Sequence, residues 1–460
     1  MNWEKLIEAY SLKNAIEHDG KAQESRVISS LFHEGLKPEE IKEVIKLVKE
    51  TINKINSWTL LEQKAKYAEI EKLTSKRKVR EGLPELPNAK GKPVLRLAPY
   101  PSGPLHIGNA RTYLINDYYA KKYKGKLIFI MDDTIGSEEK PIAKDAYKLI
   151  PEGFDWLGIK YKKPIIYRSD RLNIYYEYAE KLIRMNKAYV CSCSQEKIKG
   201  NREKMKECAC RQYPVKQQLE RWKKMFDAKP GELVLRIKTS MEDRNPAFRD
   251  RVLLKIADRI HPRVGKKYRV WPLLDFSNSI DDHLLEITHI IRGKDLMIES
   301  DMEKFIWNIF GWKHAEIIHT GLLRLKGIKI SKSKGQQEIK SGKYTGWDDP
   351  RTWSIQSLEK RGIQAEALKE FLLDFGLTER ETEASLESLY AKNRELLHPI
   401  AKKVSFTLEK GNAKIIMDTG EVVYGSVPGK LKKGIYHLLK WGYCNLVKPG
   451  RINEFWFAHP

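Results

Sequence analysis

Apolar residues near the start of the chain recur with the period of an α-helix. Pro38 suits the first turn of such a helix, and the segment 38–55 places its apolar side chains on one face. A second helical stretch ends in the basic run SKRKVR (75–80), and GLPELPNAKGKP (82–93) then breaks regular structure, as a linker does. We therefore expect a helical N-terminal domain over residues 1–88. Its apolar face consists of Ile41, Val44, Ile45, Val48, Ile52 and Ile55.

The hydrophobic pattern changes at Val94. VLRLA (94–98) predicts a buried strand, the loop APYPSGPLHIGN (98–109) follows, and GNARTYLINDYYAKKY (108–123) predicts a helix. A second apolar strand, KLIFIMDD (126–133), ends in two carboxylates. Strand, glycine loop, helix and strand make a βαβ unit, in which ligand loops lie at the carboxyl ends of the strands. The pattern predicts an α/β fold.

The remainder of the chain alternates between helical and strand-like blocks. Helical stretches lead to a cysteine-bearing segment (191–210) and a Lys/Arg-rich helix, QQLERWKKMF. A β-rich block runs from ELVLRI (232–237) to HIIRG (289–293), and residues 353–400 are again helical and charged. Beyond them the pattern is β-like, with turns expected at Gly420, Gly425 and Gly429.

Composition narrows the class of partner. The 460 residues carry 85 Lys and Arg against 61 Asp and Glu, a formal net charge of +24, which favours a polyanion such as nucleic acid. The alternative is a basic surface with many ion pairs, as in thermophilic proteins. Five cysteines make no disulfide scaffold, no run has the length of a membrane span, and the N-terminus is no secretory signal. We expect a cytoplasmic protein with no membrane association.

Two loops carry candidate phosphate chemistry. In the first, His106 follows a Gly/Pro-rich turn and Gly108 allows close approach to the backbone. In the second, KISKSKG (329–335), two lysines are placed to close on phosphates. Each loop alone is compatible with an ordinary exposed turn. Together, PLHIGN and KISKS resemble the HIGH and KMSKS signature loops of class I aminoacyl-tRNA synthetases.

Further segments resemble glutamyl-tRNA synthetases of the archaeal type, over roughly residues 10–405. They include RLAPYPSGPLHIGN, FDWLGIKY, IIYRSDRLNIYYEYAEKLI, HPRVGKKYRVWP, HIIRGKD and YTGWDDPRT. The resemblance implies a Rossmann-type catalytic domain with an inserted domain that binds the tRNA acceptor arm, a helical stem-contact domain and a shortened C-terminal β-barrel. The corresponding segments are 92–190 and 252–340 for the catalytic domain, 191–251 for the insertion, 341–402 for the stem-contact domain and 403–460 for the barrel.

The resemblance also implies residue roles. The catalytic residues are His106, Lys329 and Lys332, and Lys332 would stabilise the pentavalent phosphorus. ATP, with Mg²⁺, would contact His106, Gly108, Asn109, Arg324, Leu325, Ser331 and Lys332. The amino acid would contact Arg96, Tyr100, Asp132, Asn278 and Arg292, where a guanidinium fork matches a carboxylate. The alternative for Arg96 and Asp132 is that they form a purely structural ion pair with each other.

Two C-x-C pairs form a third signal: Cys191, Cys193, Cys208 and Cys210. Four thiolates satisfy a tetrahedral zinc ion, and related synthetases often carry zinc in this insertion. The alternative is two buried cysteine pairs without metal. Cys444 stands apart. We also expect tRNA contacts from residues around Trp347, whose ring would either stack on RNA or simply pack.

Four residues depart from the family pattern. Asn109 replaces the second histidine of HIGH, and Tyr100 stands where relatives usually have Ser or Asn. Leu274 stands where they usually have a tyrosine, and Ile130 where they usually have an arginine. The C-terminal part is also shorter than the two β-barrels that follow in relatives, so anticodon reading is in doubt.

The resemblance implies the activity of a glutamate–tRNA ligase in which tRNA must be bound before glutamate is activated, and we expect a monomer. The alternatives are a glutaminyl or non-discriminating enzyme, a paralogue that glutamylates a modified tRNA base, and a non-catalytic tRNA-binding paralogue. Arg292 favours glutamate, and the intact KISKS loop disfavours the two paralogues.

Overall fold

The computed structural model describes residues 3–74, 82–135, 141–328, 330–409 and 411–460. They belong to two compact units that divide between Glu81 and Gly82. The basic run 75–80 lies outside the described residues. The predicted linker 82–93 has no helix or strand, but it is packed onto the second unit, because Leu83 and Leu86 are buried in that unit's core.

The first unit is helical. It contains α1 (Trp3–Glu17), α2 (Glu24–His33), α3 (Ile41–Asn56) and α4 (Leu60–Ile70). Helix α3 confirms the helix predicted here, after a single 3₁₀ turn at Pro38–Glu40. Val44, Val48, Ile52 and Ile55 are buried in the core, because their spacing keeps them on one side of the helix.

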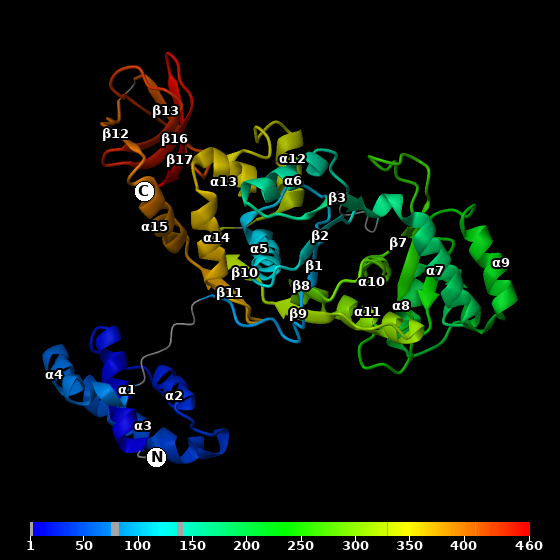
Figure 1. Cartoon of the computed structure of the whole chain (residues 1–460), viewed down its shortest axis with the longest axis horizontal. Helices are drawn as coiled ribbons and strands as arrows, with labels where there is room; N and C mark the ends of the chain where they lie inside the picture. Colours follow the sequence, from blue (N-terminus) through cyan, green and yellow to red (C-terminus); the bar gives the residue numbers. More distant parts are fainter. Residues whose placement is uncertain (1–2, 75–81, 136–140, 329, 410) are drawn as a thin grey trace. The chain divides into compact units, whose positions relative to one another are not determined.

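The second unit contains the predicted βαβ unit. Strands β1 (Val94–Leu97), β2 (Lys126–Met131) and β3 (Lys162–Tyr167) are parallel, and α5 (Ile107–Lys122) joins β1 to β2. A second parallel pair, β8 (His289–Gly293) and β9 (Glu316–Thr320), lies beside β1. The backbone N–H of Thr288 donates to the carbonyl of Val94 over 2.9 Å at this junction. Helix α6 (Ala146–Trp156) precedes β3 (Figure 1).

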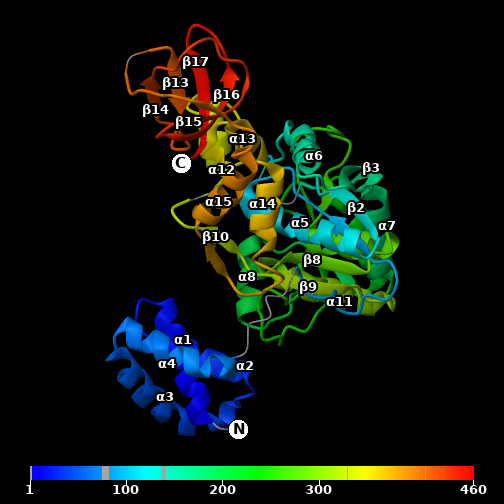
Figure 2. The same cartoon turned by 60° about the vertical axis from the view of Figure 1, so that its left-hand side comes forward.

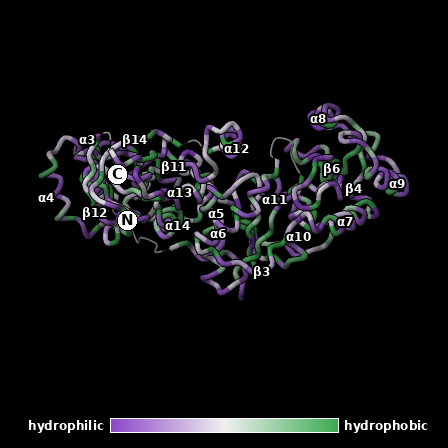
Figure 3. The backbone as a smooth tube through the Cα atoms, turned by 90° about the horizontal axis from the view of Figure 1, so that it is seen from above, coloured by the Kyte–Doolittle hydropathy of each residue, from purple (hydrophilic) through white to green (hydrophobic). Residues whose placement is uncertain are grey.

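An antiparallel sheet interrupts this parallel arrangement. It contains β4 (Ala188–Cys191), β5 (Val234–Ile237), β6 (Val252–Ile256) and β7 (Val270–Pro272). The insertion was expected to span residues 191–251, but the strands of this sheet begin before Cys191 and continue beyond Arg251 in the sequence. The associated helices are α7 (Leu172–Arg184), α8 (Gln195–Glu203) and α9 (Val215–Met225), and α9 is the predicted basic helix. Figure 3 shows α8 and α9 as largely hydrophilic.

A helix that was not predicted follows this sheet. Helix α10 (Leu274–Leu284) lies inside the block expected to be β-rich, and α11 (Met297–Phe310) packs against it. Every side chain of α10 from Asp275 to Asp282 is buried. Phe276, Ile280 and Leu284 recur at helical spacing, but the expectation of a β-rich block passed over this signal.

The charged segment 353–400 is helical, as predicted, and contains α13 (Ile355–Arg361), α14 (Ala365–Leu373) and α15 (Leu386–Leu397). Helix α12 (Lys332–Lys340) was not predicted, because it begins inside KISKSKG (329–335), which was expected to be a loop. Figure 2 shows α14 and α15 side by side, and α14 also packs against α5. One short strand was not expected: β11 (Thr382–Ala384) pairs in parallel with β10 (Leu323–Leu325).

The C-terminal residues form a six-stranded sheet in the order β12-β15-β16-β17-β13-β14. Beyond the two edge strands, Thr407 and Ser426 exchange backbone hydrogen bonds of 3.2 and 2.9 Å. Gly425 ends β14 and makes no turn; a Cβ there would lie 2.2 Å from the ring of Phe406. Gly420 and Gly429 do occupy turns, with φ of 84° and 67°. The strands are β12 (Lys402–Val404), β13 (Ala413–Ile416), β14 (Val422–Gly425), β15 (Gly434–Leu438), β16 (Gly442–Lys448) and β17 (Asn453–His459).

Arg361, the last residue of α13, joins this helix to the C-terminal sheet through hydrogen bonds. The side chain is fully buried, and its Nε and Nη2 donate to the carbonyls of Phe457 and Ala458, each over 2.9 Å. Among the helices that the structure describes, none is both long and apolar enough to span a membrane.

Candidate active site

A cavity of about 390 Å³ opens where β1, β2 and β8 end. This is the edge of a parallel sheet at which ligands bind in α/β folds. The structure brings most of the predicted ligand-binding side chains to this one cavity. The predicted residues that line it are Arg96, Tyr100, His106, Gly108, Asn109, Asp132, Asn278 and Arg292.

The first signature loop presents His106 at the start of α5. The side-chain carbonyl of Asn109 accepts the backbone N–H of His106 over 2.9 Å, so the residue that replaces the second histidine caps the helix. A Cβ at Gly108 would lie 3.1 Å from Nδ1 of His106, so glycine leaves room for the imidazole. Burial and the charge of Lys332 lower the pKa of His106 to about 3, which keeps the ring neutral at physiological pH.

The second signature loop closes against the first. Ser331 caps α12, because its hydroxyl accepts the backbone N–H of Lys334 over 3.2 Å, and Lys332 is the first residue of that helix. Between the loops lies a small cavity of about 50 Å³, lined by His106, Ser331 and Lys332 among others. Lys329 lies outside the described residues.

Trp347 packs between the two loops. A Cβ on Gly103, in the first loop, or on Gly335, in α12, would lie 3.1 Å from its ring. The ring is half-buried and packs against both loops, and its stacking on RNA stays a prediction.

Two residues expected at the adenosine end do not reach the cavity. Arg324 has 68% of its side chain exposed and pairs with Glu381 over 3.2 Å, and Leu325 is buried in the hydrophobic core. Leu322 and Leu323 line the cavity instead. The sequence motif located this segment but did not fix which of its consecutive residues faces the ligand.

The opposite end of the cavity contains paired charges. Asp132, just after β2, forms an ion pair with Arg168, with 2.8 Å between its Oδ1 and Nη1, and it accepts a hydrogen bond from the hydroxyl of Thr134 over 3.1 Å. Arg96 instead makes a bidentate pair with Asp282 of α10, so the suggested Arg96–Asp132 ion pair does not form.

Tyr100 and Leu274 complete the walls of the amino-acid end. Burial and the charge of Asp132 raise the pKa of Tyr100 to about 12, so its hydroxyl stays protonated as a hydrogen-bond donor. Leu274, the first residue of α10, gives the cavity an apolar patch. Ile130, which replaces an arginine of relatives, is fully buried in an apolar cluster and takes no part in the site.

Sequence reasoning missed the side chains that hold the ligand-binding residues in place. Arg168 is fully buried and joins Asp132, Asp281 and Asn278 through its guanidinium. Asn278 also donates to Glu303 of α11 over 2.8 Å. Arg168 stands in the YRSD segment that carries part of the family resemblance, but no pattern in the sequence marks Glu303.

The four cysteines come together at β4, as predicted. The sulfur atoms of Cys191, Cys193, Cys208 and Cys210 all lie within 4.8 Å of one another. Nη1 of Arg236 lies 3.7 and 3.8 Å from the sulfurs of Cys191 and Cys208, where its charge favours thiolates. Four converging thiols match the donor set of a structural zinc site. Cys444 is buried apart from them in β16.

Comparison with known proteins agrees with this site. Residues 93–399 match the family described as tRNA synthetases class I (E and Q), catalytic domain, and the chain belongs to this family. The glutamate–tRNA ligase of Pyrococcus abyssi is 44% identical over 421 residues, which cover 89% of this chain and 73% of the relative. The glutamate–tRNA ligase of Methanocaldococcus jannaschii is 41% identical over 407 residues, covering 88% and 72%.

Similarity to solved structures is weaker. A glutamate tRNA ligase from Elizabethkingia meningosepticum gives a TM-score of 0.45 at 20% identity, covering 67% of this chain and 70% of that one. A match at that level is too distant to support any detail of the site.

Proposed function

We propose that the protein joins glutamate to tRNA(Glu) in two steps. Glutamate and ATP form glutamyl-adenylate with release of pyrophosphate, and a ribose hydroxyl of the 3′-terminal adenosine of the tRNA then takes the glutamyl group with release of AMP. The observation that carries the proposal is the single cavity into which the first signature loop, Asp132 and Arg292 converge. Family membership and the glutamate–tRNA ligases at 41–44% identity support it.

ATP would lie between the two signature loops. Gly108 and Leu323 provide room for the nucleoside, and neutral His106 donates a hydrogen bond to the phosphates. Lys332 would neutralise the charge that builds up on the α-phosphorus and pyrophosphate during in-line attack. Mg²⁺ bound with ATP would supply further charge neutralisation.

Glutamate would occupy the end formed by Arg96, Tyr100, Asp132 and Arg292. Asp132 accepts from the α-ammonium group, and the phenol of Tyr100 donates a hydrogen bond from the facing wall. The α-carboxylate is left directed towards the phosphates. This placement converts a reaction between two molecules into one between neighbouring groups, which is a large part of the rate enhancement in such enzymes.

The tRNA would bind along the units that flank the catalytic sheet. We assign the acceptor arm to the antiparallel insertion, whose helices α8 and α9 are largely hydrophilic, and the stem to α13–α15. The Thr407–Ser426 hydrogen bonds support the proposal that the six C-terminal strands form one small barrel, which would contact the anticodon end of the tRNA. The N-terminal helices would add a further contact to tRNA.

The cysteine cluster would hold a structural zinc ion and fix the insertion. Zinc content per chain, measured by mass spectrometry of metals, tests this assignment. We expect about one zinc per chain, lost in Cys208→Ser and retained in Cys444→Ser, which removes a thiol outside the cluster. Equal zinc in both variants would contradict the assignment.

Aminoacylation of tRNA(Glu) with radiolabelled glutamate tests the function. The wild-type protein should form glutamyl-tRNA. Lys332→Ala should lower kcat by about 100-fold or more, while Lys340→Ala, which removes an exposed lysine at the far end of α12, should not. Charging with glutamine alone would favour the glutaminyl alternative, and binding of tRNA without any charging would favour the non-catalytic paralogue.

A further inference from the structure

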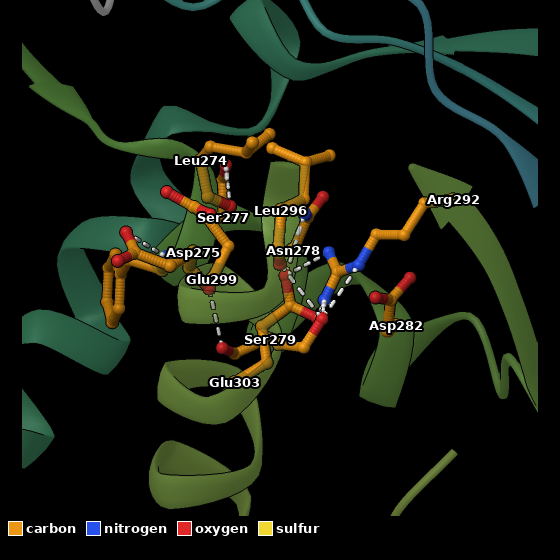
Figure 4. A network of polar contacts seen from close by, with 12 residues as sticks. Leu274, Asp275, Ser277, Asn278, Ser279, Asp282, Arg292, Leu296, Glu299 and Glu303 are labelled. Atoms are coloured by element: carbon orange, nitrogen blue, oxygen red, sulfur yellow. Dashed lines mark hydrogen bonds and ion pairs between the residues drawn. The ribbon is translucent and has the colours of Figure 1, made fainter. Parts of the chain in front are cut away.

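The guanidinium of Arg292 is already occupied by a carboxylate of the protein. Nη1 and Nη2 of Arg292 donate to the two carboxylate oxygens of Glu303, each over 2.8 Å. Nε and Nη2 also donate to the hydroxyl of Ser300, over 3.1 and 2.6 Å. Figure 4 shows the fork turned towards Glu303, with Asn278 on the same carboxylate.

Neither arginine assigned to substrate carboxylates carries an unbalanced charge. Arg96 is held by Asp282 in a bidentate pair, and Arg292 is held by Glu303 in the same way. Glu303 is fully buried, and Arg292 is 5% exposed. A buried pair of this kind leaves little positive potential to attract a third charged group.

From this arrangement we propose that Glu303 is a specificity-determining residue that competes with the side-chain carboxylate of the substrate for Arg292. The inference rests on the proposed function, because it concerns how glutamate reaches its own side-chain partner. To bind glutamate by the fork, the site must turn Glu303 away from Arg292. Until that happens, one guanidinium faces two buried carboxylates, which repel each other.

The competition affects glutamate more than a neutral analogue. A glutamine side chain needs only one N–H of the guanidinium for its amide oxygen, and it adds no charge to the pocket. The resident carboxylate therefore weakens glutamate binding and narrows the preference for glutamate over glutamine. Glu303 acts through Arg292, so its effect falls on substrate binding rather than on the chemical step.

Glu303→Gln removes the competing charge and keeps the shape of the side chain. The amide oxygen can still accept from Asn278 and from Nη1, while Nη2 is left for the substrate. Glu299→Gln is the matched control: it is the same change one turn earlier on α11, and Glu299 pairs with Arg251 rather than Arg292. Aminoacylation kinetics with glutamate and with glutamine would be measured for all three proteins.

We expect Glu303→Gln to lower KM for glutamate by about tenfold, with kcat and the KM for ATP unchanged. The KM or Ki for glutamine should not fall together with the KM for glutamate. Discrimination against glutamine should therefore also rise by about tenfold. Glu299→Gln should match the wild type. An unchanged or raised KM for glutamate in Glu303→Gln would overturn the proposal and make Glu303 a support for Arg292.

Inhibition of the wild-type enzyme by glutamine tests the proposal without a variant. If Glu303 competes, glutamine should inhibit glutamylation with a Ki within about tenfold of the KM for glutamate. A Ki for glutamine more than about 1,000-fold above that KM would show that Glu303 does not compete for Arg292, and it would overturn the proposal. If the wild type charges no glutamate at all, the proposed function itself has failed.

Discussion

Replacing Gly108 by alanine separates the geometry of the ATP site from the stability of the fold. Gly108 lies in the first turn of α5, and its missing side chain is what allows the imidazole of His106 to lie over that turn. The added methyl group would be 3.1 Å from Nδ1 and 3.2 Å from Cε1 of His106, and 3.7 Å from Cδ1 of Ile330.

The expected magnitude follows from these contacts. Carbon–nitrogen contacts below about 3.5 Å are repulsive, so the ring must move by a few tenths of an ångström. Misplacing a catalytic group by about 1 Å costs about 100-fold in rate, so we expect kcat/KM for ATP to fall by about 10- to 100-fold. Alanine also favours a helix over glycine by about 0.5–1 kcal/mol, so the protein should not lose stability.

ATP–pyrophosphate exchange in the presence of tRNA, together with thermal unfolding, checks both parts. Gly200→Ala is the control for stability: Gly200 lies inside α8, and apart from the helix's own nearby backbone no atom lies within 4 Å of its added Cβ. It should gain stability. Wild-type exchange by Gly108→Ala would refute the claim that the imidazole needs this space.

Three further predictions follow from contacts near the site and the C-terminal sheet. Trp347→Ala should raise KM for ATP several-fold, measured by the same exchange assay, because the two signature loops lose the ring packed between them. Arg361→Met should lower stability by about 3 kcal/mol, seen in thermal unfolding, because the carbonyls of Phe457 and Ala458 lose their donor; an unchanged unfolding temperature would contradict this. The imidazole of His106, followed by NMR with His106→Gln for assignment, should stay neutral from pH 8 to 5, because its pKa is about 3. This lowered pKa also means that stability is lost as the pH falls below the ordinary histidine value, and a midpoint near 6.5 would contradict the burial.

Much of the fold and one end of the site could be predicted from the sequence. The strands at 94–97 and 126–131 are continuous apolar runs bounded by turn residues, which is the pattern of a buried parallel strand. Neither signature loop is diagnostic alone, but the two together resemble the class I signature loops, so His106, Gly108 and Lys332 were located by motif and resemblance together.

The remainder depends on partners distant in the sequence. Helix α10 was missed because the block around it was expected to be β-rich, although Phe276, Ile280 and Leu284 recur at helical spacing. The partners of its buried polar residues lie on other elements, as Glu303 does for Asn278. The motif placed Arg324 at the ATP site, but its side chain is exposed and pairs with Glu381. A motif does not determine which residues of a short strand face a cavity. Glu303 lies eleven residues beyond Arg292, and only the packing of α11 against β8 and α10 brings the two side chains together.

The central claim is that this cavity activates glutamate with ATP when tRNA is bound. Its most direct test is ATP–pyrophosphate exchange with each of the standard amino acids, with and without total tRNA from the source organism. We expect tRNA-dependent exchange with glutamate, with glutamine as the one other amino acid able to compete. Exchange with a different amino acid, or none at all from a folded protein that binds tRNA, would contradict it.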